Sequence, residues 1–129
     1  MEVRKFTIKD YPIICRWYES RGEVVPSLDY FPETSYIASL NGEDMYHISI
    51  WKTNTPYCYF ENFASNPNIP LMNKREILPR FLDYLLNLSN GMGFKMAFAL
   101  SKNDKTSKLY SDMGWPGSSC KLTAHGRLT

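Results

Sequence analysis

A short apolar segment followed at once by an amphipathic helix pattern is the feature that most constrains how this chain folds. Residues 95–100, Lys-Met-Ala-Phe-Ala-Leu, lie just after a glycine and are mostly apolar, which is typical of a buried strand. Asn103 or Asp104 can begin a helix, because their side-chain oxygens accept the free N–H groups of a first turn. Gly114 ends the helix, since glycine adopts the left-handed conformation at little cost. One face of this helix is formed by residues at i, i+3, i+4 and i+7, namely Thr106, Leu109, Tyr110 and Met113.

The composition is that of an ordinary soluble domain. The chain has 129 residues, enough for one compact domain with its own core, so we expect a single domain over residues 1–129. Hydrophobic residues make up 43% and charged residues 22%, both of which are normal for globular proteins. The formal net charge of +2 is too small to favour a nucleic-acid partner through bulk electrostatics.

The cysteines and the N-terminal residues indicate the compartment. Cys15, Cys58 and Cys120 are odd in number and lack the spacing of metal ligands, which favours free thiols in a reducing compartment. Residues 1–10 are charged and contain no apolar segment like that of a signal peptide. No apolar run approaches the length of a membrane span. We therefore expect a cytoplasmic protein, in the host cytoplasm if the chain is viral, with no metal site and no membrane partner.

The rest of the chain alternates between strand and helix patterns. Asn41-Gly42 is the strongest hairpin signal, because both residues tolerate positive φ. Pro79 makes the start of the second helix ambiguous: either a turn at residues 73–77 precedes a helix that begins near Pro79, or the helix is kinked there. Helices are expected at residues 13–21 and 81–90, a loop with one short helical turn at 23–34, and strands at 3–8, 35–40, 44–52, 57–64, 118–123 and 124–128.

The motif after residues 95–100 resembles the last conserved motif of a known family. Asn103, the pair Leu109-Tyr110 and the pair Gly114-Trp115 have the spacing of that motif in the GNAT family, the Gcn5-related N-acetyltransferases. The order strand, helix, three-strand meander, helix, strand, helix, strands is similar to the family fold over nearly the whole chain. The resemblance implies an α/β (α+β) fold with a mixed, mostly antiparallel sheet flanked by helices, and a parallel pair where a helix crosses over.

GNAT enzymes move an acetyl group from acetyl-CoA to an amine. The resemblance therefore implies acetyl-CoA as cofactor and an amine, on a small molecule or a protein, as acceptor. The family holds the pyrophosphate on backbone N–H groups at the start of the central helix, where the helix dipole favours an anion. Counting back from Gly93 places that motif on residues 73–78, Asn-Lys-Arg-Glu-Ile-Leu. Glu76 and Leu78 stand where the family has small residues, and the Glu76 carboxylate would repel phosphate. The expected cofactor contacts here are Asn73, Lys74 and Arg75, the last two through direct pairing with phosphate.

The resemblance also implies two catalytic residues. Tyr110 matches the position whose hydroxyl protonates the departing thiolate as a general acid in many members; the alternative is an ordinary core tyrosine. Glu61 lies on the last strand of the meander, where members often carry a general base; it can instead face water at the sheet surface. His47 is a lone histidine, which is more often structural than catalytic. Asn103 is either a cofactor contact or only a helix cap.

The cofactor would also need a gap in the sheet. The resemblance implies that the strand holding Phe63 diverges from the strand holding Ala97, and that the gap admits the pantetheine arm beside Phe63, Ala64 and Ser65.

Two functions remain open at this point. One is an N-acetyltransferase with Tyr110 as acid and Glu61, or a water relay in its place, as base. The other is a GNAT-like protein that has lost cofactor binding and works as a structural or protein-binding module. The aromatic-rich meander is similar to that of small phage-encoded proteins of this general type, which often have a weak phosphate loop.

Overall fold

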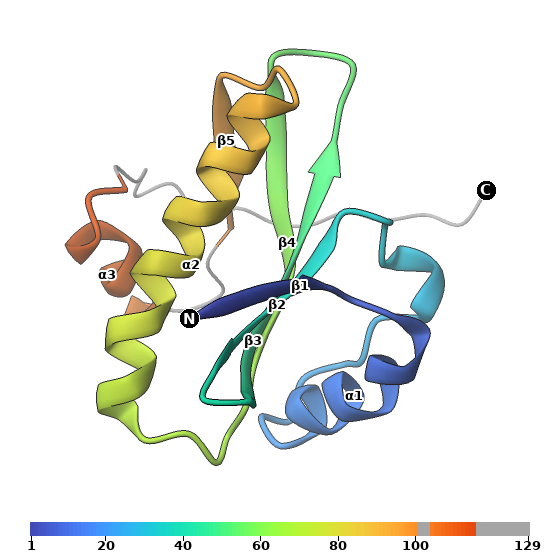
Figure 1. The fold of residues 1–129 in the computed structure, drawn as a ribbon, viewed down its shortest axis with the longest axis vertical. Helices are drawn as coiled ribbons and strands as arrows, with labels where there is room; N and C mark the ends of the chain where they lie inside the picture. The colour runs from blue at the N-terminus through green and yellow to red at the C-terminus, as the bar shows by residue number, and fades with distance from the viewer. Residues whose placement is uncertain (101–103, 116–129) are drawn as a thin grey trace.

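The computed structural model describes residues 1–100 and 104–115 of the 129-residue chain. Within them, five strands form one sheet in the order β1-β2-β3-β4-β5 (Figure 1). The β1–β2, β2–β3 and β3–β4 pairs are antiparallel, and β4 and β5 are parallel, which confirms the mixed, mostly antiparallel sheet. The strands are β1 (Glu2–Lys5), β2 (Ser35–Leu40), β3 (Glu43–Lys52), β4 (Tyr57–Ser65) and β5 (Met96–Ala99).

Helices cover both faces of the sheet. The long helix α2 (Leu71–Gly91) and α3 (Asp104–Asp112) lie on one face, and α1 (Tyr11–Glu19) lies on the other (Figure 1). Two short 3-10 helices, η1 (Ile8–Asp10) and η2 (Leu28–Tyr30), precede and follow α1 along the chain. The short helical turn expected within residues 23–34 is therefore present as η2.

Alternation along the strands fills both layers of the core. In β2, Ile37 packs with Trp17 and Tyr18 of α1, whereas its neighbours Tyr36 and Ala38 belong to the cluster beneath α2. This is the period of two that a strand with both faces covered requires. The buried stripe of α2 in that second cluster consists of Ile77, Leu78, Phe81, Leu82 and Leu85.

The β2–β3 hairpin confirms the strongest local signal in the sequence. Asn41 has a φ of 53° and Gly42 a φ of 79°, so both turn residues are left-handed. Left-handed residues at both central positions match the twist of the flanking strands. The turn sets the β2–β3 register that starts at Leu40 and Glu43.

Two element boundaries differ most from the sequence prediction. The first strand ends at Lys5, because Thr7 already serves as the N-cap residue of η1. Of the two alternatives at Pro79, the separate turn at residues 73–77 is excluded, because α2 runs as one helix from Leu71 through Pro79. Burial of Ile77 and Leu78 extends the apolar stripe one turn before the proline, which offsets the hydrogen bond that Pro79 cannot donate. The strands predicted at residues 118–123 and 124–128 lie outside the described residues, as does Asn103.

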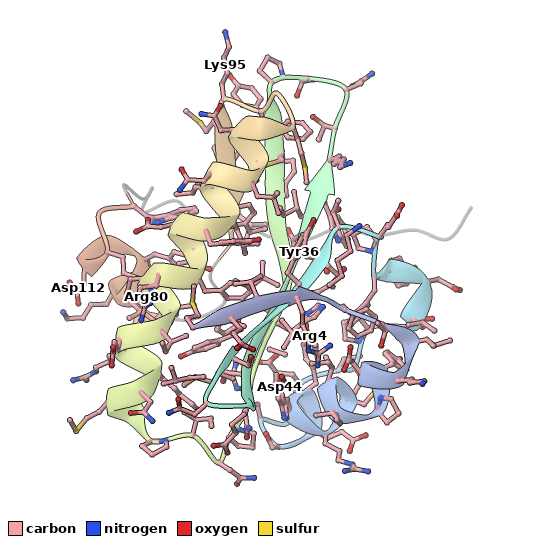
Figure 2. All side chains as sticks on the ribbon, in the orientation of Figure 1. Arg4, Tyr36, Asp44, Arg80, Lys95 and Asp112 are labelled. Atoms are coloured by element: carbon pink, nitrogen blue, oxygen red, sulfur yellow. The ribbon has the colours of Figure 1, made fainter. Side chains whose placement is uncertain are left out.

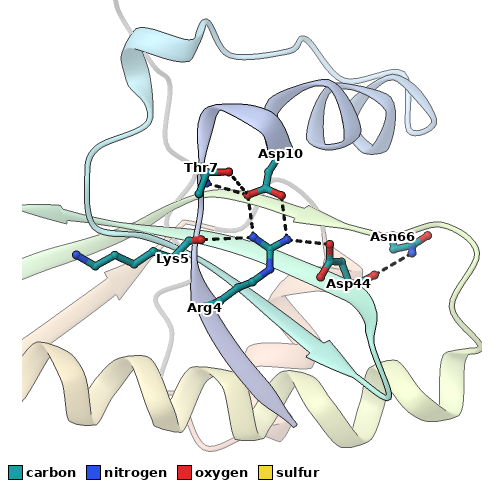
Figure 3. A network of polar contacts seen from close by, with 6 residues as sticks. All are labelled: Arg4, Lys5, Thr7, Asp10, Asp44 and Asn66. Carbon is teal, nitrogen blue, oxygen red and sulfur yellow. Dashed lines mark hydrogen bonds and ion pairs between the residues drawn. The ribbon is translucent and has the colours of Figure 1, made fainter.

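A charged network ties β1 to η1 and β3. The Arg4 guanidinium donates to both carboxylate oxygens of Asp10, at 2.9 Å each, and to Asp44 at 3.0 Å (Figure 3). The backbone N–H and the hydroxyl of Thr7 also donate to Asp10, which closes a capping box at the start of η1. Burial alone would raise the pKa of Asp10, but these donors and the Arg4 charge lower it below its usual value.

Replacing Asp10 tests how much this network stabilises the fold. Asp10→Ala removes a bidentate partner of Arg4 and the carboxylate of the capping box at the start of η1, so the free energy of unfolding should fall by about 2 kcal/mol. Chemical denaturation measures this directly. Asp112 is the matched control, because its ion pair with Lys108 is exposed and lies far from Arg4 and Asp44 (Figure 2). Asp112→Ala should change stability by at most about 0.5 kcal/mol, and an equal loss in both variants would contradict the prediction.

Candidate active site

The parallel partner of β4 ends before β4 does. Tyr57–Phe60 pairs with Met96–Ala99, which is the whole of β5, whereas in the described part of the chain the only strand partner of residues 61–65 is β3. We call residues 61–65 the open end of β4. The strand that holds Phe63 thus runs on past the end of the strand that holds Ala97, and the divergence of the two strands that the resemblance implied stays a prediction.

A β-bulge marks the start of the open end. Ser49 pairs with Glu61 and His47 with Ala64, so a two-residue step on β3 faces a three-residue step on β4. Asn62, inside the bulge, has a φ of 55°. An extra residue moves the following side chains to the opposite face.

The bulge decides which side chains face α2. Phe60 before the bulge and Phe63 after it both pack in the cluster beneath α2, while Ala64 packs with α1. A single face holding Tyr57, Tyr59, Glu61 and Phe63, as regular alternation would give, is therefore not formed. Tyr57 and Tyr59 are exposed instead.

Arg21 reaches the open end from the chain just after α1. Its guanidinium donates to the Ser65 hydroxyl and lies 5.5 Å from the centre of the Phe63 ring. Glu23 is 4.0 Å away, at the limit of an ion pair. Sequence reasoning placed Arg21 only on a helix face, and nothing local in the sequence shows that α1 ends beside β4.

Electrostatics link the two catalytic candidates. Burial, and to a lesser degree the charge of Glu61, raises the pKa of Tyr110 to about 12. Tyr110 also packs against Trp115, with ring centres 5.4 Å apart, and Trp115 contacts Phe60. Burial first, then the charges of Glu23 and Glu61, also raises the pKa of Tyr18. Tyr110 is thus protonated at neutral pH and lies within the electrostatic reach of Glu61.

The start of α2 holds the candidate phosphate contacts. Lys74 N–H donates to the carbonyl of Pro70 at 3.2 Å, so the available N–H groups of the helix start belong to residues 71–73. Asn73 therefore lies in the first turn, and Arg75 just after it is exposed. The Tyr46 hydroxyl donates to the Lys74 carbonyl at 3.2 Å, which fixes this turn against β3.

The two residues that depart from the family motif sit one turn further on. Leu78 is only 3% exposed and faces the core. Glu76 is exposed and pairs with Arg80 at 3.8 Å, one helical turn away. Neither residue belongs to the first turn of α2, so neither occupies the N–H groups at the helix start.

Two features, a cluster of metal ligands and a membrane-length apolar helix, are absent from the described residues. Residues 1–100 and 104–115 contain no cluster of three or more His, Cys, Asp or Glu side chains able to hold a metal. Among the same residues, no helix is both long and apolar enough to cross a membrane. Cys15 and Cys58 are free thiols, and burial raises the pKa of Cys58, which makes it a poor nucleophile.

His47 is fully buried behind the bulge. Burial lowers its pKa to about 4, against smaller opposing effects of the Asn62 carbonyl and the Asp10 charge. The imidazole is therefore neutral at physiological pH, which argues against a role as an acid in the folded protein.

This buried histidine makes stability depend on pH. Between about pH 6.5 and pH 4 the unfolded chain binds a proton at His47 that the folded chain does not, so stability falls as pH falls, by roughly 3 kcal/mol in all. The Asp10 carboxylate adds its own loss only below about pH 4, since its pKa is already lowered. Denaturation of wild type and His47→Asn from pH 7 to pH 4.5 measures the effect. The variant should show a clearly flatter profile; parallel profiles would contradict the assignment.

Comparison with known proteins supports the fold. No protein-family model and no curated protein matches the sequence. Among solved structures, N-acetylglutamate synthase from Neisseria gonorrhoeae, complexed with coenzyme A and L-arginine, aligns with a TM-score of 0.70 and 18% identity over 86% of this chain. Ard1 from Thermoplasma volcanium aligns with a TM-score of 0.70 and 17% identity over 88% of this chain and 80% of its own.

A third similar structure is an aminoglycoside acetyltransferase from an uncultured soil sample, with a TM-score of 0.62 and 12% identity over 99% of this chain and 95% of its own. The present chain spans only 26% of the N-acetylglutamate synthase chain. At these identities the likeness concerns architecture rather than substrate. The sheet order, the parallel pairing of β4 with β5 and these alignments together show that the chain has the fold of the Gcn5-related N-acetyltransferase superfamily.

Proposed function

We propose that the chain is an acetyl-CoA-dependent N-acetyltransferase that acetylates an amine. The observation that carries the proposal is the open end of β4, where the parallel partner stops and the charge of Glu61 reaches a buried, protonated tyrosine. Enzymes with this fold that were crystallised with coenzyme A support it. Phe63, Ala64 and Ser65 would lie beside the pantetheine arm of the acyl donor.

The chemistry assigns one proton transfer to each catalytic candidate. Acetyl-CoA, when bound, supplies an acyl group that is already activated as a thioester. Glu61, directly or through a water molecule, would remove a proton from the acceptor ammonium so that the nitrogen can form the new C–N bond, and the nitrogen would release a second proton to solvent as the amide forms. Tyr110 would donate its hydroxyl proton to the sulfur as the C–S bond breaks, and the phenolate would regain a proton from solvent. Tyr110 is protonated at neutral pH, as an ordinary tyrosine is, and burial, which raises its pKa to about 12, makes it a weaker acid.

The start of α2 fits an anion despite the missing glycines. The N–H groups of residues 71–73 point out of the helix start, which carries partial positive charge. Lys74 and Arg75 add positive charge beside them, and Asn73 adds an amide donor. Glu76 is engaged by Arg80, so part of its repulsion is already offset. Direct pairing to these side chains would replace the close backbone approach that glycine gives.

The buried Leu78 favours a second candidate, a binding module without acetyltransferase activity. A leucine in the core at the position of a small residue shows that α2 is built for packing there. In that case the open end of β4 would keep its shape without binding coenzyme A.

Calorimetric titration of coenzyme A separates the two candidates. If the phosphates sit at the start of α2, Glu76→Gln should tighten binding and Arg75→Ala should weaken it by roughly two- to fivefold, more at low salt than at high salt. Lys95→Ala is the control of equal charge, because Lys95 lies beyond the opposite end of α2 (Figure 2). It should leave the affinity unchanged.

Two other outcomes of the titration have distinct meanings. Absence of heat and of thermal shift at millimolar coenzyme A, in wild type and in Glu76→Gln, would reject the enzyme and leave the binding module. Tight binding that neither variant alters would move the phosphates away from residues 73–75.

Tyr110→Phe tests the acid. Turnover should fall by roughly 10²-fold, because general acids typically contribute that much, while the melting temperature changes little. Tyr59→Phe is the matched control, since Tyr59 is an exposed tyrosine on β4 outside the open end. Full turnover in a folded Tyr110→Phe protein would exclude the acid role.

A further inference from the structure

The bulge in β4 is held from behind by His47. The Nδ1 atom of His47 lies 2.8 Å from the carbonyl oxygen of Asn62. A carbonyl can only accept, so Nδ1 carries the hydrogen, and in the neutral ring Nε2 is left as an acceptor. Among the described residues Nε2 has no hydrogen-bond partner. The contact to Asn62 is thus the polar function that the structure shows for this fully buried ring.

Aromatic packing fixes the orientation of that ring. Phe31 stacks on His47, with centres 5.0 Å apart and planes at 28°, and Phe6 meets it edge-on at 5.2 Å. A ring held on two sides cannot swing its Nδ1 away from the strand. Phe31 follows η2, so this packing also joins the segment after α1 to the bulge.

The side chain of Asn62 makes a second set of ties. Its amide nitrogen donates to the Tyr30 carbonyl at 2.9 Å and to the Ser49 hydroxyl at 3.1 Å. Ser49 in turn shares a hydrogen bond of 2.7 Å with Ser35, whose hydroxyl donates to the Pro32 carbonyl. The bulge is therefore bonded to β3, to β2 and to the end of η2.

These hydrogen bonds matter because the bulge determines which face of the sheet each later side chain of β4 occupies. A left-handed, non-glycine residue inside a strand costs free energy that its surroundings must offset. The bulge also takes the Asn62 carbonyl out of the regular ladder, so this group needs another donor. If β4 paired with β3 without the bulge, Phe63 and Ser65 would lie on the opposite face of the sheet.

We propose that His47 is a positioning residue for the acyl-donor site: its Nδ1–H holds the Asn62 carbonyl, keeps β4 bulged, and thereby presents Phe63 and Ser65, with Arg21 resting on them, at the open end. The link to an acyl donor rests on the proposed function. The link to the bulge does not.

Three substitutions at position 47 separate the Nδ1 hydrogen bond from simple filling of space. The amide nitrogen of His47→Asn can occupy the place of Nδ1, whereas His47→Gln places its amide near Nε2, and His47→Leu offers no donor. We expect coenzyme A affinity to stay within about threefold in His47→Asn and to fall by about tenfold or more in the other two, the worth of one hydrogen bond. Circular dichroism checks that each variant is folded at the temperature used.

Nitrogen NMR gives a readout that ordinary packing would not move. In wild type at neutral pH, Nδ1 of His47 should carry the hydrogen and show the coupling or shift of a hydrogen-bond donor, and Nε2 should be bare. Nuclear Overhauser contacts between β3 and β4 should show residue 47 opposite Ala64 in wild type and in His47→Asn. In His47→Leu these contacts should show a changed register between the two strands. Asn62→Gly, which keeps the carbonyl and permits positive φ, should retain the wild-type register.

Three results of these experiments would contradict the positioning role of His47. A hydrogen on Nε2, an unchanged β4 register in His47→Leu, or equal loss of affinity in His47→Asn and His47→Leu would overturn the positioning role. If wild type binds no coenzyme A, the proposed function fails, while the tautomer and the register still decide whether His47 holds the bulge.

Discussion

The end of β5 partway along β4 is the constraint on which the rest of the structure depends. Beyond the four residues that pair with β5, the only strand partner of β4 among the described residues is β3, and the bulge interrupts that pairing at residues 62 and 63. Unpaired strand groups are costly unless water, a side chain or a ligand meets them. Several features lie next to this one strand, where the sheet stops being regular: the helices on both faces, the buried histidine and the arginine after α1.

Electrostatics around the open end combine opposite charges rather than a single sign. Arg21 lies over Phe63 and beside Ser65, and Glu23 approaches it closely. Burial raises the pKa of two tyrosines, Tyr18 and Tyr110, one from each face of the sheet, and the charge of Glu61 adds to both shifts. The start of α2 adds positive charge through Lys74 and Arg75. Such an arrangement suits a reaction in which an anionic donor and a cationic amine meet, and it explains why the small overall charge of +2 carries no information about the site.

Much of the fold could be read from the sequence because its signals are local. Asn41-Gly42 specifies the hairpin through two left-handed residues, and the apolar spacing around Phe81 specifies α2. What could not be read depends on contacts between distant segments. The bulge at Asn62 needs His47 behind it, and Arg21 gains meaning only beside Ser65. The helix start at Leu71 was missed because Pro79 is a strong local stop signal, which the burial of Ile77 and Leu78 overrides.

Pro79 divides α2 into two parts of unequal local stability. Because a proline has no N–H, the carbonyl of Arg75 loses its usual helical partner, and the turns before and after it are joined less tightly. Leu71, Met72, Asn73 and Arg75 are exposed, so little burial holds the first turn closed, and the buried anchors of this part, Ile77 and Leu78, lie just before the proline. Amide hydrogens in the first turn will exchange with solvent through small local openings, while those around Phe81 and Leu85 will exchange only when the whole domain unfolds. The segment that would meet a phosphate is thus also the part of the helix that can rearrange most cheaply around one.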